Sequence, residues 1–179
     1  MARQTRETRF GNVLEIREAE SEDAEALLAY AETISFESDY LSFGPGEFNL
    51  TVDQEREFLS NCQSAENQIF LVALVDCSIV ASAMFIGGAR KRDAHTGTLG
   101  LSVARAFWRQ GIGAALMEEL ILWAEGNSVL RKLQLKVRTD NVAAIQLYLN
   151  HQFRFEGLVT EDFCIDGQYF DHYLMARRV

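Results

Sequence analysis

A short segment around two closely spaced glycines has the composition of a binding site for a charged group. Residues 108–114, W-R-Q-G-I-G-A, lie between an apolar, partly β-branched run and a stretch whose apolar residues recur at helical spacing. A glycine turn at a helix N-terminus leaves backbone N–H groups without acceptors, and the helix dipole adds about half a positive charge there. Because glycine has no Cβ, a ligand can approach this backbone closely. The segment therefore predicts a phosphate or pyrophosphate site, although a Gly-x-Gly pair also forms ordinary tight turns.

The glycine spacing argues against two common nucleotide-binding motifs. The segment has no third glycine at the spacing of a dinucleotide fold and no Gly-Lys-Ser/Thr of a P-loop. It also falls beyond the middle of the 179-residue chain, whereas a dinucleotide-binding fold usually opens with its glycine turn. We therefore expect another phosphate-bearing cofactor.

A second motif follows and indicates which cofactor this is. Residues 133–138 alternate as a strand, Thr139-Asp140-Asn141 has the composition of a turn and helix cap, and residues 142–150 have a helical pattern. An extended run begins at His151. In this order, V-R-T-D-N-V-A-A-I-Q-L-Y-L-N-H-Q-F-R-F-E-G resembles the cofactor-binding half of the GNAT superfamily of N-acetyltransferases, and the resemblance covers roughly residues 95–179.

The chain departs from the family pattern at two positions. Trp108 stands where the pyrophosphate loop usually begins with Arg or Gln, and Gln152 replaces the glycine that precedes the final-strand Phe. The donors of the loop are mainly backbone N–H groups, which the first change leaves in place. We expect the second change to affect only a local turn.

The resemblance implies acetyl-CoA as co-substrate, no metal, and a set of cofactor-binding residues. Leu101, Ser102 and Val103 would line the pantetheine arm, with the Val103 N–H contacting the thioester carbonyl. Arg109 would either reach a phosphate or remain solvated. The pyrophosphate would be held by the backbone amides of the loop, namely Gln110, Gly111, Ile112, Gly113 and Ala114.

The helix after the second motif supplies the expected catalytic group. Tyr148 matches the tyrosine of the family's Ala-x-x-Leu-Tyr helix, which often protonates the sulfur of coenzyme A. Its other interpretation is a half-buried tyrosine on an amphipathic helix. Ala144 is the alanine of that motif and is expected near the cofactor. Asn141 matches the family's Asn that contacts the cofactor or orients the helix, and the same residue type is common at helix starts.

Candidates for the acceptor side are less specific. Glu37, Asp39 and Tyr40 lie in the segment that lines the acceptor site in this family, where carboxylates could hold a cationic amine or be routine loop acids. His95 has the pKa class of a general base, and as a surface residue of a polar loop it would have no such role. Many family members deprotonate the amine through water, so no side-chain base is required. Asp171 and His172 near the C-terminus are further candidates.

Composition indicates one globular domain. The net charge of −9 argues against nucleic-acid binding through a basic surface and is compatible with a cationic substrate. No apolar run approaches the ~20 residues that span a bilayer. Three cysteines cannot all pair within one chain, and the polar N-terminus does not resemble a secretory signal, so we expect free thiols and a cytoplasmic location. We expect a flexible lead-in over residues 1–10 and a single N-acetyltransferase domain over 11–179.

Hydrophobic patterning places the remaining elements. Strands are expected at 12–17, 68–75 and 78–87, with a tight turn at Asp76-Cys77 and a second hairpin turn at Asp166-Gly167. Ser21 is expected to cap one helix, and Thr51 and Gln54 form a capping box for another. Helices between strands together with hairpins predict an α/β fold with a mixed, mostly antiparallel central sheet flanked by about four helices, the GNAT fold.

These observations favour an N-acetyltransferase that moves the acetyl group of acetyl-CoA to a primary amine of a small molecule by direct attack. The sequence I-D-G-Q-Y-F-D-H-Y-L-M-A-R resembles the branch that includes polyamine, amino-acid and ribosomal-protein acetyltransferases. Amine antibiotics are a further acceptor class. The alternatives are a protein N-terminal acetyltransferase and a non-catalytic acyl-CoA-binding regulatory domain. We expect neither nucleic acid nor membrane as partner, and strand edges near the C-terminus suggest a homodimer.

Overall fold

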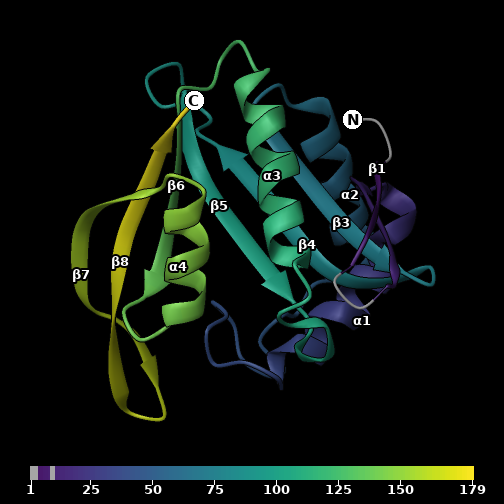
Figure 1. The fold of residues 1–179 in the computed structure, drawn as a ribbon, viewed down its shortest axis with the longest axis horizontal. Helices are drawn as coiled ribbons and strands as arrows, with labels where there is room; N and C mark the ends of the chain where they lie inside the picture. Colours follow the sequence, from purple (N-terminus) through teal and green to yellow (C-terminus); the bar gives the residue numbers. More distant parts are fainter. Residues whose placement is uncertain (1–3, 9–10) are drawn as a thin grey trace.

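The computed structural model describes residues 4–8 and 11–179, which form one mixed sheet and its covering helices (Figure 1). The strands are β1 (Gln4–Glu7), β2 (Val13–Glu18), β3 (Gln68–Val75), β4 (Ser78–Gly87), β5 (Thr96–Val103), β6 (Lys132–Arg138), β7 (Arg154–Ile165) and β8 (Gln168–Arg178). The helices are α1 (Ala24–Ser35), α2 (Val52–Ser64), α3 (Ile112–Glu125) and α4 (Val142–Asn150), with short 3-10 turns at η1 (Ser21–Asp23) and η2 (Arg105–Phe107).

The strands are ordered β1-β2-β3-β4-β5-β6-β8-β7 across the sheet. Neighbours are antiparallel throughout, except that β5 and β6 run parallel. The expected α/β fold with a mixed, mostly antiparallel sheet and four flanking helices is confirmed. Both expected hairpins also form, because Val75 pairs with Ser78 across the first turn and Ile165 pairs with Gln168 across the second.

The sheet is covered on both faces because its central strands are apolar on both faces. In β3, Ile69, Leu71 and Ala73 belong to the main core, which also contains α3 and part of α4. The alternate residues Val72 and Leu74 belong to a second cluster with α1 and α2. This alternation follows from the period of two residues along a strand. Helices α3 and α4 therefore lie on one face, with α1 and α2 on the other (Figure 1).

Part of the expected lead-in over residues 1–10 forms a strand. Residues 4–7 form strand β1, which pairs antiparallel with β2, while residues 1–3 and 9–10 of that lead-in lie outside the described part of the chain. The strand Q-T-R-E has no apolar alternation, so hydrophobic patterning could not identify it. Arg6 anchors it to α3 through ion pairs with Glu118 and Glu119.

The two expected helix starts have different outcomes. At α2 the capping box forms, with Thr51 Oγ1 accepting from the Gln54 N–H at 3.2 Å. At η1 the prediction for Ser21 is wrong, because Glu20 is the cap residue and shares a capping box with Asp23. The Asp23 side chain is also held by Arg17, from which both of its carboxylate oxygens accept, at 2.6 and 2.8 Å.

Candidate active site

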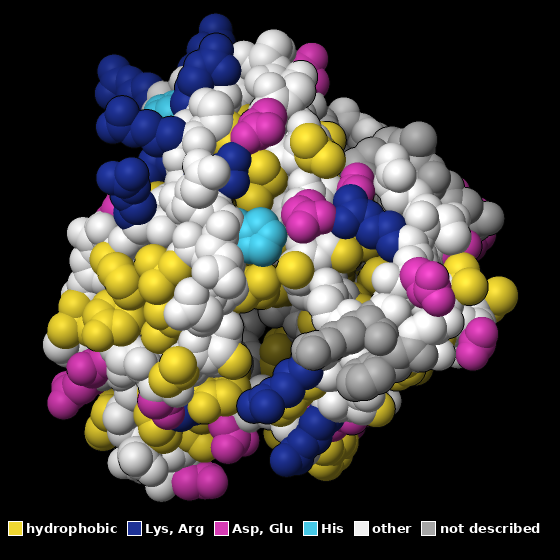
Figure 2. Space-filling model, viewed as in Figure 1, with side chains coloured by type: hydrophobic (Ala, Val, Ile, Leu, Met, Phe, Trp, Pro, Cys, Tyr) yellow, Lys and Arg dark blue, Asp and Glu magenta, His cyan; other side chains and the backbone are white. Residues whose placement is uncertain are grey.

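The site begins where two parallel strands separate. Strands β5 and β6 pair only through Thr96–Thr98 and residues 132–134, although β5 continues to Val103 and β6 to Arg138. The sheet therefore opens into a gap between the C-terminal halves of these strands. Figure 2 shows the face that carries α3 and α4 hollowed near its centre, with hydrophobic and basic side chains at the rim.

Backbone groups of β5 point into this gap. The Gly88 N–H donates to the Thr96 carbonyl and the Ala104 N–H donates to the Val80 carbonyl, both at 2.9 Å. Even-numbered residues of β5 thus direct their polar groups toward β4, and the alternation directs those of Leu101 and Val103 toward β6. No strand of the described chain pairs with them there. The Val103 carbonyl accepts from Trp108 Nε1 at 2.6 Å, while the Val103 N–H faces the part of the gap where β5 and β6 are not paired.

The glycine loop leads from this strand end into α3. Gly111 is the N-cap at φ +86°, and Arg109 precedes it at φ +59° with its side chain exposed. The first backbone bond of the helix runs from the Ala115 N–H to the Gly111 carbonyl at 3.0 Å. The N–H groups of the three residues between them, Ile112, Gly113 and Ala114, therefore have no acceptor within the helix. These are three of the backbone amides that the sequence analysis expects to hold the pyrophosphate. The Gln110 side chain stays on its own turn, donating to the Ala106 carbonyl at 3.1 Å.

Helix α4 closes the other side of the gap. Asn141 Oδ1 accepts from the Ala144 N–H at 3.1 Å, so Asn141 is the N-cap of this helix, and Ala144 packs against the main core. A Cβ built on Gly113 would lie 3.5 Å from the Leu147 side chain, so the start of α3 adjoins α4 directly. Tyr148 is buried, and burial raises the pKa of its hydroxyl to about 12.

The segment between α1 and α2, residues 36–51, is here called the acceptor loop. The Glu37 carboxylate accepts from the Arg105 N–H at 2.7 Å, just beyond the end of β5. The Asp39 carbonyl accepts from Arg138 Nη1 at 3.0 Å, and the Tyr40 ring lies 4.7 Å from the same guanidinium. The loop is thereby fixed to the ends of both separated strands and lies at the wide end of the gap (Figure 1).

Other sequence-predicted residues have different positions. His95 directly precedes β5, about 26 Å along the strand from Val103, so the structure does not bring it to the site. Ser102 Oγ is hydrogen-bonded to the Tyr30 hydroxyl at 2.9 Å and to Ser82 Oγ at 3.0 Å, on the face away from α3. His172 is buried beside Arg138 in the strand register, with Nδ1 3.3 Å from Asp162, and its pKa is lowered, mainly by burial.

Sequence reasoning did not single out Arg138, although it joins the acceptor loop to the end of β6. The only local signal is Asp140 two residues later, whose carboxylate accepts from Arg138 Nε at 3.0 Å and from Nη2 at 2.6 Å. The contacts with Asp39 and Tyr40 span about a hundred residues of sequence and depend on the fold.

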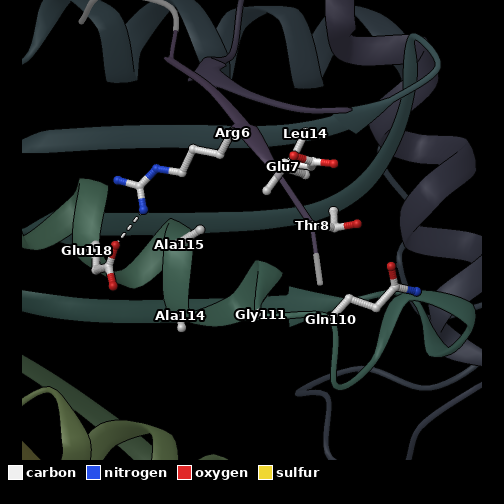
Figure 3. A pocket seen from close by; sticks show the side chains of 9 residues that line it. All are labelled: Arg6, Glu7, Thr8, Leu14, Gln110, Gly111, Ala114, Ala115 and Glu118. Carbon is white, nitrogen blue, oxygen red and sulfur yellow. Dashed lines mark hydrogen bonds and ion pairs between the residues drawn. The ribbon is translucent and has the colours of Figure 1, made fainter. Parts of the chain in front are cut away.

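A separate pocket of about 180 Å³ lies outside the gap, between β1 and the start of α3 (Figure 3). Leu14 and the side chains of β1 line one side, while Gln110, Gly111 and Ala114 line the other. It adjoins the glycine loop but lacks the Val103 N–H, Tyr148 and the acceptor loop. The gap, and not this pocket, therefore combines the features of the site.

Leu101 and Val103, which have no strand partner on the β6 side, thus lead along β5 to the glycine loop and the start of α3. Residues 24–153 match the acetyltransferase (GNAT) family. An acetyltransferase of the GNAT family from Streptococcus pneumoniae has the same fold, with a TM-score of 0.91 and 36% identity over 93% of this chain and 99% of that one. The protein therefore belongs to the GNAT acetyltransferase family.

Two further relatives extend the comparison. The L-amino acid N-acetyltransferase AaaT of Escherichia coli (strain K12) is 31% identical over 107 residues, covering 60% of this chain. The chain spans 66% of that relative's length, slightly less than two thirds. A GNAT superfamily phosphinothricin acetyltransferase from Sinorhizobium meliloti, solved in complex with acetyl-CoA, has a TM-score of 0.80 at 16% identity, covering 92% of this chain and 87% of that one. At this identity it shows the shared fold alone.

Two kinds of feature are absent from the part of the chain that the structure describes. No three His, Cys, Asp or Glu residues in that part of the chain are grouped so that they could hold a metal ion. None of its helices has the length and apolarity needed to cross a membrane.

Proposed function

We propose that the protein transfers the acetyl group of acetyl-CoA to a primary amine of a small molecule, by direct attack within a ternary complex. The observation that carries the proposal is the gap between β5 and β6, into which the backbone groups of Leu101 and Val103 point. A pantetheine arm in this gap would continue the sheet as an extra strand-like segment. Its pyrophosphate would then lie at the amides of Ile112, Gly113 and Ala114.

The chemistry assigns one role to each group. The amine nitrogen attacks the thioester carbon, and the oxygen that gains charge is stabilised by the Val103 N–H. The C–S bond breaks, and the departing thiolate takes the proton of the Tyr148 hydroxyl. The attacking nitrogen loses its second proton as the amide forms, and this proton restores the Tyr148 hydroxyl through water. With a pKa of about 12, Tyr148 is protonated at neutral pH and is available as this acid.

The acceptor must arrive as, or become, a free amine. An alkylammonium has a pKa near 10.4, so its deprotonation at pH 7 costs roughly 4 to 5 kcal/mol. We assign this proton to water, because His95 is remote and His172 is buried. The Asp39 carboxylate lies on the acceptor loop and would attract the ammonium form. Polyamines, amino acids and amine antibiotics remain the candidate classes, and the AaaT relative, named for acetylating L-amino acids, favours testing amino acids first.

The decisive experiment measures thiol release from acetyl-CoA with a panel of amines, together with acetyl-CoA binding by calorimetry on the same sample. Release with one class of amine supports the proposal and identifies the acceptor. Binding without release on small amines favours a protein N-terminus as acceptor or a non-catalytic acyl-CoA-binding role, which a panel of N-terminal peptides then separates. Absence of binding rejects the proposed site.

We also infer a homodimer. Strand β7 is the edge of the sheet, and it exposes Phe155 by 50% and Leu158 by 54%. An uncovered edge with apolar side chains favours pairing with a second chain. Size-exclusion chromatography with light scattering tests the inference, and a monomer at micromolar concentration would reject it.

A further inference from the structure

Arg138 connects three segments that are far apart in the sequence. Only 6% of the residue is exposed. Its guanidinium lies 4.7 Å from the centre of the Tyr40 ring, in the acceptor loop, and 3.7 Å from that of Phe170, in the β7–β8 hairpin. Nη1 donates to the Asp39 carbonyl, and Nε and Nη2 donate to the Asp140 carboxylate. The Arg138 side chain is thus held both by the rings of Tyr40 and Phe170 and by the hydrogen bonds that it donates.

These contacts require the chemistry of arginine. A planar guanidinium can lie against aromatic rings while its edge makes paired hydrogen bonds, whereas an ammonium group provides only a point charge. A buried cation also needs a partner, and Asp140 neutralises this one. The end of β6 therefore offers a rigid anchor without a net charge that would repel a cationic amine.

Arg138 contacts the proposed acceptor site but not the proposed cofactor site. Glu37 fixes the start of the acceptor loop beyond the end of β5, and Arg138 fixes Asp39 and Tyr40 at the end of β6. Between these two points the loop lies across the wide end of the gap. The glycine loop and the start of α3, where the pyrophosphate is expected, make none of these contacts with Arg138.

We propose that Arg138 is a positioning residue that holds the acceptor loop across the gap and thereby determines the affinity for the amine but not for acetyl-CoA. This inference rests on the proposed function, because it needs the acceptor to enter beneath this loop. Arg138 does not itself take part in the chemistry. It acts through the backbone of Asp39 and the ring of Tyr40.

The first test needs no substrate. Chymotrypsin cleaves after aromatic residues, and of the four in the acceptor loop, Phe36, Tyr40, Phe43 and Phe48, the last two are the sites that are followed, because they are kept in every variant and lie beyond Tyr40. We expect R138Q to be cleaved at these two sites at least five times faster than wild type, with R138K intermediate. Y40A, which removes a 43% exposed ring, should show the same trend and keeps the test decisive if R138Q does not fold. The matched control is R56Q, which also loses one Arg–Asp pair, with Asp53 on α2, and should behave as wild type.

The second test separates the amine from the cofactor. With the amine identified by thiol release, R138Q and Y40A should raise the KM for the amine at least tenfold, while the KM for acetyl-CoA stays within twofold. A general loss of structure would weaken both. Unchanged cleavage in the loop together with an unchanged amine KM overturns the inference, as does an equal loss of acetyl-CoA affinity.

The two proposals fail in different ways. If wild type acetylates no amine, the proposed function and the expected effect on amine affinity are both rejected. Loop cleavage in R138Q and Y40A still decides whether Arg138 is the anchor. If wild type is active and the variants have wild-type loop cleavage and kinetics, only the inference about Arg138 fails.

Discussion

At the scale of single residues, Tyr148 carries the most direct prediction. Burial raises the pKa of its hydroxyl to about 12, so the group is protonated over the whole neutral range. If it protonates the departing thiolate, Y148F should lower kcat by about 100-fold, within the usual range for a lost general acid. Acetyl-CoA binding should stay within threefold, because the ring remains packed near Phe153. Thiol release and calorimetry measure the two effects.

The matched control for this change is Y173F. Tyr173 is also packed against the main core, where its ring lies 4.8 Å from that of Phe155 on the β7–β8 hairpin. Loss of its hydroxyl should leave kcat unchanged. A Y148F enzyme with the wild-type kcat would show that another group, or water, protonates the thiolate.

Residue-scale features were predictable where a contact is local in sequence. Asn141 caps the helix that begins with the next residue, and Gly111 takes the left-handed turn that starts α3. The contact between Arg138 and Tyr40 could not be predicted, because only the folded sheet brings the acceptor loop to the end of β6. For the same reason the sequence did not predict that the Glu37 carboxylate, a candidate for holding a cationic amine or a routine loop acid, accepts a hydrogen bond from the Arg105 N–H.

At the scale of elements, the start of α3 depends on the backbone of Gly111. A Cβ at this position would meet nothing within 4 Å, so the cost of G111A comes from φ +86° alone, about 1 kcal/mol. Relaxation of this angle would also turn the loop amides, and we expect acetyl-CoA to bind about tenfold more weakly, equivalent to 1.4 kcal/mol. Urea unfolding and calorimetry measure the two changes. G113A is the control for stability, since its Cβ meets only ordinary contacts at 3.5 Å or more. A stable G111A with full affinity would contradict this account of the loop.

The turn between α4 and β7 carries a second prediction at this scale. Gln152 stands where the family has glycine, and it adopts φ +65°, which L-residues occupy at a cost. Q152G should therefore raise the free energy of unfolding by about 0.5 to 1 kcal/mol, the strain relieved less the greater chain entropy of glycine. Thermal unfolding would show a rise of about 2 °C.

The control for this substitution uses the same residue pair in a helical position. Q146G lies in the middle of α4 and should destabilise the protein by about 1 kcal/mol. If Q152G also lowers the melting temperature, the left-handed turn is not a source of strain.

Among the elements, turns of this kind were predictable from glycine and polar residues. Strand β1 was not, because its pairing with β2 and its ion pairs to α3 leave no apolar pattern in the sequence.

At the scale of the whole molecule, the mixed sheet was predictable but its opening was not observable in the sequence. The apolar alternation of β3 and the two hairpins indicate a largely antiparallel sheet. That β5 and β6 pair only through Thr96–Thr98 is not marked by any local pattern in the two strands, because pairing between them is a non-local property of the fold. The family resemblance supplied the expectation that the Val103 N–H contacts the cofactor, and the hydrogen bonds of Thr96 with Gly88 and of Ala104 with Val80 indicate which residues of β5 face away from β6.

Two buried tyrosine hydroxyls and one buried thiol make the free energy of unfolding depend on pH in the alkaline range. Burial raises the pKa of Tyr30 and of Tyr148 to about 12 and that of Cys62 to about 11. Their unfolded values are near 10 for tyrosine and 8.5 for cysteine. Since the folded pKa is the higher one, the associated stability is fully present below the unfolded pKa and is lost as pH rises toward the folded pKa.

We therefore expect the free energy of unfolding in urea to fall from about pH 9, where the Cys62 thiol ionises in the unfolded chain. The fall should become steeper from about pH 10, where the two tyrosines ionise in the unfolded chain. For each tyrosine, the rise of the pKa from about 10 in the unfolded chain to about 12 in the folded protein contributes on the order of 3 kcal/mol. Y148F removes one titrating group without removing its ring, so between pH 10 and pH 12 its stability should decline less than that of wild type. Parallel curves for Y148F and wild type would mean that burial does not raise the pKa of the Tyr148 hydroxyl. The assignment of Tyr148 as an acid that burial keeps protonated would then be wrong.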